Sequence, residues 1–419
     1  SLGGLAISPE EGSWVASLSL LGALVGGLPA GLALRLGRRR VLAAVALPFA
    51  GAWWLAAGAG SVRALYAAAF VSGLCSAVVA LVTPVYVSEI AQPRVRGGLC
   101  AVTKVASNAG MLLSFSLGGF LDWRQLALVA SAGPLLLVLA CCAVPETPSF
   151  LLFRGREREA QVALQWLRGA RADVAAEHAV LRANILQIRA GSGGGGASGV
   201  GGVPGRPRAL LRPLLVTCGL MLLQKFSGVN AFSFYAVPIL SKTFARTSAH
   251  GAAVVVCLLQ ILAGLTSGVL IDTVGRLPLL AVSSALMSLA LAGFGTFVYV
   301  VDASQLLTDG QQAPLDWIPM SCVLVFQVAF SLGVGPISWL LIGELFPLRH
   351  RGLGAFATSV SYGCAFVSVK TFVDLERALG LHGVFWLYAA VSALCLVFVL
   401  AWVPETRGKE LPEMERTGC

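Results

Sequence analysis

Charged residues recur in the same order and spacing in the two halves of this chain. Glu89 precedes Arg96 by seven positions, Glu344 precedes Arg351 by the same interval, and 255 positions separate the two copies. Each copy lies between long runs of apolar residues. A carboxylate or guanidinium in apolar surroundings is costly unless an opposite charge compensates it. The chemistry that this pattern predicts is therefore ion pairing between the ends of helices.

Two further pairs of motifs repeat in the same order. Gly37-Arg38 corresponds to Gly275-Arg276, and Pro145-Glu146-Thr147 corresponds to Pro404-Glu405-Thr406. We expect one cluster of ion pairs in each half. The expected pairs are Glu89 with Arg38 or Arg39, Glu344 with Arg276, Glu146 with Arg96, and Glu405 with Arg351. The alternative is that these charges only stabilise helix ends and membrane topology.

Isolated amide side chains stand inside otherwise apolar runs. Gln224 and Asn230 lie six positions apart in one run, and Gln260 lies in the next run. Trp339 follows a segment at 333–336 that contains helix-breaking Gly and Pro residues. A polar residue in such a run either lines a cavity or hydrogen-bonds one helix to another. We interpret Gln224 and Asn230 as candidates for one wall of a central cavity.

The elements that must position these residues are membrane-spanning helices. Hydrophobic residues make up 57% of the chain and charged residues 12%, and the mean hydropathy is +0.82, whereas ordinary globular domains carry about 25% charged residues. A helix of about 20 apolar residues crosses a bilayer. Eleven such runs lie near residues 14–34, 41–60, 64–90, 99–120, 124–144, 210–240, 250–271, 277–301, 318–345, 352–373 and 381–403. The pairing of the two halves leaves the first half one span short, so we expect a further helix before residue 1.

A Gly-rich tract separates the two halves. Residues 191–205 read GSGGGGASGVGGVPG, which is typical of a flexible linker. Before this tract, apolar residues alternate with charges, which indicates short helices that are either interfacial or cytosolic. We predict an N-terminal helical bundle at 1–148, a cytoplasmic helical segment with the linker at 149–209, a C-terminal six-helix bundle at 210–403 and a cytoplasmic tail at 404–419. Repeats at half-chain distance are typical of duplicated membrane bundles.

The net charge of +10 raises the question of a nucleic-acid partner. The basic residues, however, gather in alternate loops between the apolar runs. These loops lie near residues 35–40, 94–96, 154–212, 276, 349–351 and 407–409. The positive-inside rule places them in the cytoplasm, with residue 1 outside and the C-terminus inside. The lipid bilayer, and not nucleic acid, is therefore the expected partner.

Several motifs in a fixed order resemble those of a known family. They are PVYVSEI at 84–90 with Arg96-Gly97, PETPSFLL at 145–152, QKFSGVNA at 224–231, GPISW at 335–339, ELFP at 344–347 and PETRG at 404–408. From about residue 13 to 412 the chain resembles the sugar porter family, the facilitative glucose transporters of the major facilitator superfamily. Ser331 stands where many plasma-membrane members carry Glu, so the chain is more similar to the intracellular-type class. The resemblance implies an all-α fold of two bundles with eleven of its twelve membrane helices present.

The resemblance also assigns roles to the amide residues. It implies that Gln224, Asn230 and Gln260 contact a sugar, and that Trp339 lines the cavity on a flexing helix. Sugars present hydroxyl groups and apolar C–H faces, which amides and an aromatic ring complement. Ion-pair clusters that bridge helices only while the cytoplasmic side is closed would bias a two-state rocking equilibrium.

Two lysines depart from the pattern of the family. Lys104 stands where the family has a sugar-contacting Gln, and Lys225 replaces the second Gln of a Gln-Gln pair. Ammonium groups within a membrane are costly unless paired. Near the cavity, they would suit an anionic or differently shaped ligand better than a neutral hexose. Alternatively, the two lysine side chains extend to the membrane–water interface or face a water-filled vestibule.

We therefore expect a facilitative transporter of a hexose such as glucose, working by alternating access. The sequence contains no nucleotide-binding loop, metal cluster or catalytic arrangement, so neither enzyme activity nor a cofactor is expected. The alternatives are a non-transporting sugar sensor or scaffold, and a carrier of another small polar or anionic metabolite. The expected location is the plasma membrane or an endosomal or lysosomal membrane. The oligomeric state is left open.

Overall fold

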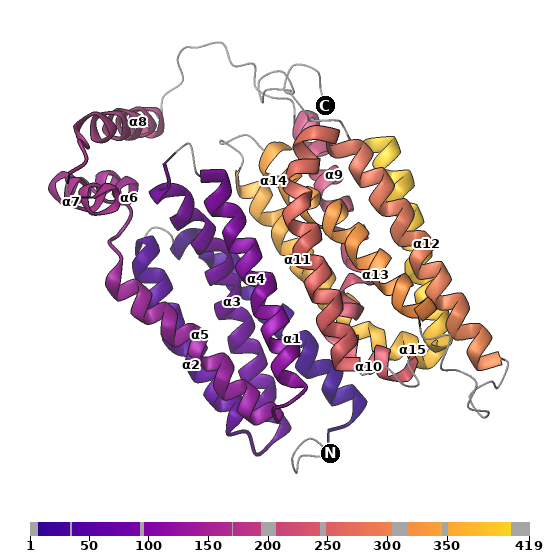
Figure 1. The fold of residues 1–419 in the computed structure, drawn as a ribbon. Coiled ribbons are helices and arrows are strands. Elements are labelled where there is room, and N and C mark those ends of the chain that lie inside the picture. Colours follow the sequence, from indigo (N-terminus) through magenta and orange to yellow (C-terminus); the bar gives the residue numbers. More distant parts are fainter. Residues whose placement is uncertain are drawn as a thin grey trace.

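A computed structural model describes residues 7–33, 36–92, 96–169, 171–193, 207–243, 249–303, 317–345 and 351–403. Throughout these ranges the regular structure is helical and contains no strand. The helices form two bundles that stand side by side, joined in sequence through three short helices beside one end of the first bundle (Figure 1). This arrangement agrees with the all-α, two-bundle fold that the sequence predicts.

The first bundle consists of five helices within the described residues. They are α1 (Pro9–Ala33), α2 (Arg38–Ala57), α3 (Val62–Ile90), α4 (Arg96–Gly118) and α5 (Trp123–Ala143). Glycines allow α1 and α3 to approach closely: a Cβ at Gly22 would collide with the backbone of Phe70, and one at Gly73 with the backbone of Ser19. Small residues at helix contacts are how membrane bundles pack, because lipid supplies no hydrophobic drive between helices.

Three short helices follow the first bundle, α6 (Pro148–Phe153), α7 (Glu157–Arg168) and α8 (Ala175–Gly193). The Arg168 side chain connects them to the bundle, because it donates to the carbonyl of Ile90 at 3.0 Å and forms an ion pair of 2.6 Å with Glu177. This guanidinium holds the pKa of the Glu177 carboxyl below its usual range. The three helices therefore lie beside the end of α3 (Figure 1).

The second bundle begins with three helical segments in one span, α9 (Pro207–Gln224), the π-helix η2 (Lys225–Val229) and α10 (Asn230–Thr243). It continues with α11 (Ala249–Val274), α12 (Arg276–Ala303), α13 (Trp317–Leu332), α14 (Val334–Leu345) and α15 (Arg351–Trp402). Its core contains a cluster of buried aromatic rings, in which Phe232 contacts Phe294, Phe326 and Phe385. These side chains come from four different spans, so the cluster fixes the spans relative to one another.

All eleven predicted spans coincide with helical segments of the described residues. Nine stretches there are long and apolar enough to cross a membrane, and α4 adds a shorter apolar stretch at Val105–Gly118. The long helix α15 covers the last two predicted spans. They meet at Gly380, whose φ of 71° and ψ of 167° break the helix. Eleven spans therefore fit the sequence prediction for this part of the chain.

The two bundles contact each other through α1 with α15 and through α4 with α11, as far as the described residues show. At the start of α1, Glu10 pairs with Arg377 at 2.7 Å. One turn further, Lys370 donates to the Ser13 hydroxyl at 3.0 Å and lies over the Trp14 ring at 4.8 Å. The bundles are thus joined at the end opposite to α6–α8 (Figure 1).

Candidate functional site

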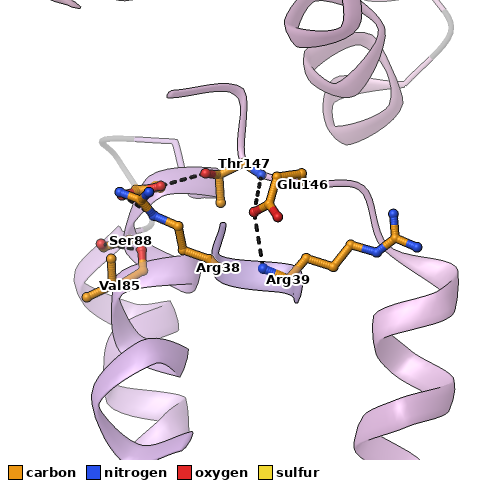
Figure 2. A network of polar contacts seen from close by, with 7 residues as sticks. Arg38, Arg39, Val85, Ser88, Glu146 and Thr147 are labelled. Carbon is orange, nitrogen blue, oxygen red and sulfur yellow. Dashed lines mark hydrogen bonds and ion pairs between the residues drawn. The ribbon is translucent and has the colours of Figure 1, made fainter. Parts of the chain in front are cut away.

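An ion pair connects α2 and α3 at the α6–α8 end of the first bundle. Arg38 is the first residue of α2, and its guanidinium donates to Glu89 Oε1 at 2.7 Å from Nη2 and 3.1 Å from Nε. The Thr147 hydroxyl donates to the other carboxylate oxygen of Glu89 at 2.6 Å. Both charged side chains are 19% exposed. The expected pair of Glu89 with Arg38 is therefore present, and Thr147 adds a third element to it (Figure 2).

Arg39 takes a different role from the one that the sequence suggests. Its backbone N–H donates to Glu146 Oε1 at 3.1 Å, while its Nε donates to the carbonyl of Cys141 at 2.6 Å. Figure 2 shows its side chain pointing away from Arg38 and Glu146. Of the two arginines expected near Glu89, only Arg38 forms the ion pair within the described residues. Arg96 begins α4, and its side chain lies outside the described residues, so its pairing with Glu146 stays a prediction.

Glycine conformation explains how the chain enters this cluster. Gly37 has a φ of 109°, and a Cβ there would lie 2.6 Å from Glu146 Oε2. Such positive φ values favour glycine because side chains on L-residues clash. The turn that brings Arg38 to Glu89 therefore favours glycine at position 37.

The second bundle repeats this backbone arrangement. Gly275 has a φ of 106° and precedes Arg276, the first residue of α12. Glu344 is the penultimate residue of α14, as Glu89 is of α3, and Arg351 begins α15, as Arg96 begins α4. The side chains of Glu344 and Arg351, and the whole of Glu405, lie outside the described residues. Ion pairs among them therefore stay predictions.

Gln224 lies where two broken helices of the second bundle meet. It ends α9 just before the π-helix, in which Gly228 has a φ of 90°. Its side-chain amide donates to the carbonyls of Val334 and Gly335, at 3.0 and 3.3 Å, beside the break between α13 and α14. The residue is 1% exposed, and its Oε1 accepts no hydrogen bond from the described residues. A buried acceptor without a donor among the described residues thus lies at a junction of two helix breaks.

Lys225, Asn230 and Trp339 lie around the same junction. Asn230 donates from Nδ2 to the carbonyl of Lys225 at 3.2 Å, and Ser368 donates to that carbonyl at 3.0 Å. The Lys225 ammonium lies 5.7 Å from the centre of the Trp339 ring, within the range of a cation–π contact. Lys104 is part of α4, but its side chain lies outside the described residues.

Gln260 has a partner that the sequence reading missed. Its Nε2 donates to Oε1 of Gln327 on α13 at 2.6 Å, and Gln327 is 3% exposed. The pair borders a cavity of about 20 Å³ that Phe232 and, from the first bundle, Met111 and Phe115 also line. Gln327 gives the same signal as Gln260, a single amide in an apolar run, so that signal alone could have found it.

Comparison with known proteins identifies the family. The sequence model described as "Sugar (and other) transporter" matches residues 8–417, almost the whole chain. The chain belongs to the sugar transporter family. This is the family that the sequence motifs resemble.

Two relatives and one solved structure are similar to almost the whole of this sugar transporter. A facilitated trehalose transporter Tret1 of Apis mellifera ligustica is 35% identical over 98% of this chain and 80% of its own length. The Tret1 of Anopheles gambiae is 36% identical over 98% of this chain, which spans about half (51%) of that protein. An inward open structure of the xylose transporter XylE from E. coli superimposes with a TM-score of 0.78, at 21% identity, over 99% of this chain and 91% of its own. The last likeness shows that the fold is shared.

The structure brings the predicted sugar-site residues of this transporter into two groups. Gln224, Lys225, Asn230 and Trp339 surround the helix breaks of α9–α10 and α13–α14. Gln260 lies with Gln327 between α11 and α13. Phe232, which follows Asn230 by two positions, borders the same cavity as this amide pair. The first turn of α10 therefore connects the two groups.

Proposed function

We propose that this sugar transporter moves a neutral sugar across a membrane by facilitated diffusion, without changing it chemically. The observation that carries this proposal is the position of Gln224. Its amide N–H groups are fixed by carbonyls of a second broken helix, while its buried Oε1 has no donor among the described residues. A buried acceptor without a partner costs free energy, and a sugar hydroxyl would satisfy it.

Hexose is our first candidate substrate, and trehalose is the second. Trp339 is 39% exposed and offers an aromatic surface beside the amides, which suits the apolar face of a glucose ring. The relatives named above are facilitated trehalose transporters. Because trehalose consists of two glucose units, one glucose-binding wall would serve either sugar, and the space available for a second ring would decide between them.

The bundle contacts support a mechanism of alternating access. The bundles are joined through α1 and α15 at the end where α1 begins, beside Glu10, Ser13 and Trp14. By the positive-inside rule, the basic end with Arg38 and α6–α8 faces the cytoplasm. In that orientation the structure is closed on the outer side. The Arg38–Glu89 pair is formed at the same time, so we propose that it holds the first bundle together as one moving body.

Transport into liposomes tests the proposal. The protein is reconstituted with unlabelled sugar inside, and the uptake of labelled glucose and labelled trehalose is measured separately. We expect saturable exchange of glucose. Saturable exchange of trehalose alone would select the second candidate. Binding of either sugar without flux would favour a sensor, and neither binding nor flux would contradict the proposal.

Replacing Gln224 locates the site. In Gln224→Leu the acceptor is lost, and we expect the apparent affinity for the sugar to fall about tenfold, the effect of one hydrogen bond in a buried site. Thr266→Val is the matched control, because among the described residues the Thr266 hydroxyl donates only to carbonyls of its own helix. Equal affinities of Gln224→Leu and the unmodified protein would remove Gln224 from the site.

A further inference from the structure

A basic groove lies at the α6–α8 end of the first bundle, away from the residues of the second bundle that we propose bind the sugar. Its volume is about 650 Å³, and it separates the ends of α2 and α5 from the short helices α6 and α7. Its lining comes from the start of α2, the end of α5, the segment before α6, and one face of α7. The groove therefore lies where membrane-spanning helices meet the short helices beside one end of the first bundle.

Arginines dominate the charge of this groove. Arg39, Arg40, Arg156 and Arg158 line it, together with Glu146 and Glu159. Two of the arginines have partners of their own. Arg156 forms an ion pair with Glu159, and Arg39 donates to the carbonyl of Cys141.

The groove holds four arginines against two glutamates, a net charge of +2 (4 − 2), and Arg40 and Arg158 are its two arginines without a partner among the described residues. Both are exposed, and neither has an ion-pair partner among the described residues. They belong to different elements, α2 and α7, that border the same groove. Two guanidinium groups facing one space form a site for a phosphate, whose oxygens match the guanidinium fork.

The groove is also bordered by exposed apolar side chains. The buried face of α7, with Ala160 and Ala163, packs on Leu151 and Leu152 of α6. On another face, Val162 is 65% exposed and Trp166 is 59% exposed, one turn apart and both lining the groove. Arg158 precedes Val162 by one turn on the same face. One face of α7 thus presents a cation followed by apolar surface, as a membrane-surface helix does.

We propose that this groove binds the headgroup of an anionic phospholipid. The lipid phosphate lies between Arg40 and Arg158, and the upper part of the acyl chains contacts Val162 and Trp166. In the orientation proposed above, the groove faces the cytoplasmic leaflet, which carries the anionic lipids. The apolar border distinguishes a lipid from a free anion, because inorganic phosphate makes no use of it. A bound lipid would connect α7 to the end of α2.

Binding to the full chain in neutral detergent tests the proposal. The probes are dioctanoyl phosphatidylinositol 4-phosphate, dioctanoyl phosphatidylcholine and inorganic phosphate, and native mass spectrometry gives the fraction bound at each concentration. The variant is Arg40→Gln with Arg158→Gln. The control is Arg63→Gln with Arg171→Gln, which removes the same charge from two exposed arginines outside the groove. We expect the variant to bind the anionic lipid at least fivefold more weakly and the control to bind it as the unmodified protein does.

Three results would overturn the proposal. They are an equal loss in variant and control, equal binding of the anionic and neutral lipids, and binding of inorganic phosphate as tight as that of the anionic lipid. A second measurement does not depend on the folding of the arginine variant. A lipid brominated on its acyl chains should quench the fluorescence of the unmodified protein more than that of Trp166→Phe. Equal quenching of the two proteins would contradict the placement of the chains.

Discussion

The Arg38–Glu89 pair and the Arg377–Glu10 pair have the same chemistry and the same shortest distance of 2.7 Å, but they join different parts of the molecule. The first connects α2 and α3 within one bundle, and its side chains are both 19% exposed. The second connects α1 with α15 between bundles, and its side chains are 51% and 63% exposed. Breaking a buried pair costs much free energy, which suits a pair that stays formed within one moving bundle. In the proposed alternating-access mechanism, a pair between bundles opens in each transport cycle, and an exposed pair suits this because it contributes little free energy.

Removing the buried carboxylate should have the largest effect. Glu89→Gln leaves the Arg38 guanidinium without its anionic partner in a mostly buried place. Breaking a buried pair costs about 3–5 kcal/mol, and the partial exposure here lowers our expectation to about 3 kcal/mol. We expect the thermal unfolding midpoint in detergent to fall by several degrees.

The control for this change is Glu157→Gln, which breaks the exposed pair between Glu157 and Arg182. Exposed pairs of this kind contribute little, so its unfolding midpoint should stay within error of the unmodified protein. Equal midpoints for Glu89→Gln and Glu157→Gln would show that burial does not distinguish the two kinds of pair.

The next largest effect should come from replacing Gly37, the glycine that positions the Arg38–Glu89 pair. Gly37→Ala places a side chain at a φ of 109° and a Cβ 2.6 Å from Glu146 Oε2. Backbone strain of this kind costs about 1–3 kcal/mol. We expect a midpoint between those of Glu89→Gln and the unmodified protein. Gly275→Ala, with a φ of 106°, tests the equivalent turn of the second bundle, and a loss in only one of the two variants would contradict their equivalence.

Breaking the exposed Arg377–Glu10 pair should have the smallest effect on stability but a clear effect on the contact between the bundles. Arg377→Gln removes one of the contacts between α1 and α15, while the contact of Lys370 with the Trp14 ring remains. In a Ser13→Cys background, we expect a membrane-impermeant maleimide to react about two- to fivefold faster when Arg377 is replaced. Raising the ionic strength should reproduce this increase without the substitution. An unchanged rate in both experiments would mean that the pair does not contribute to closure.

The sequence predicted the parts that depend on local patterns. Apolar runs of the length of a bilayer fixed the spans, and charges at the ends of those runs predicted the Arg38–Glu89 pair. Arg39 could not be separated from Arg38 in this way, because the direction of a side chain depends on packing around it. Its guanidinium turns to the carbonyl of Cys141 at the end of α5.

Contacts between distant elements could not be predicted. Glu10 and Arg377 are 367 positions apart and belong to no repeated motif. A single amide in an apolar run could have singled out Gln327, but its pairing with Gln260 could not be predicted, because the pairing depends on how α11 packs against α13. The motifs thus predicted which residues line a sugar site, and the structure shows how these residues are grouped.

Reversible cross-linking between the two bundles tests the central claim, that the contact of α1 with α15 must open during transport. Ser13→Cys and Lys370→Cys are combined in a background without the native cysteines, and a short bis-methanethiosulfonate joins the two positions in liposomes. We predict that the cross-link abolishes sugar exchange and that a reductant restores it, while each single cysteine variant exchanges sugar in the presence of the reagent. Exchange that continues at the same rate through the cross-linked protein would contradict the account.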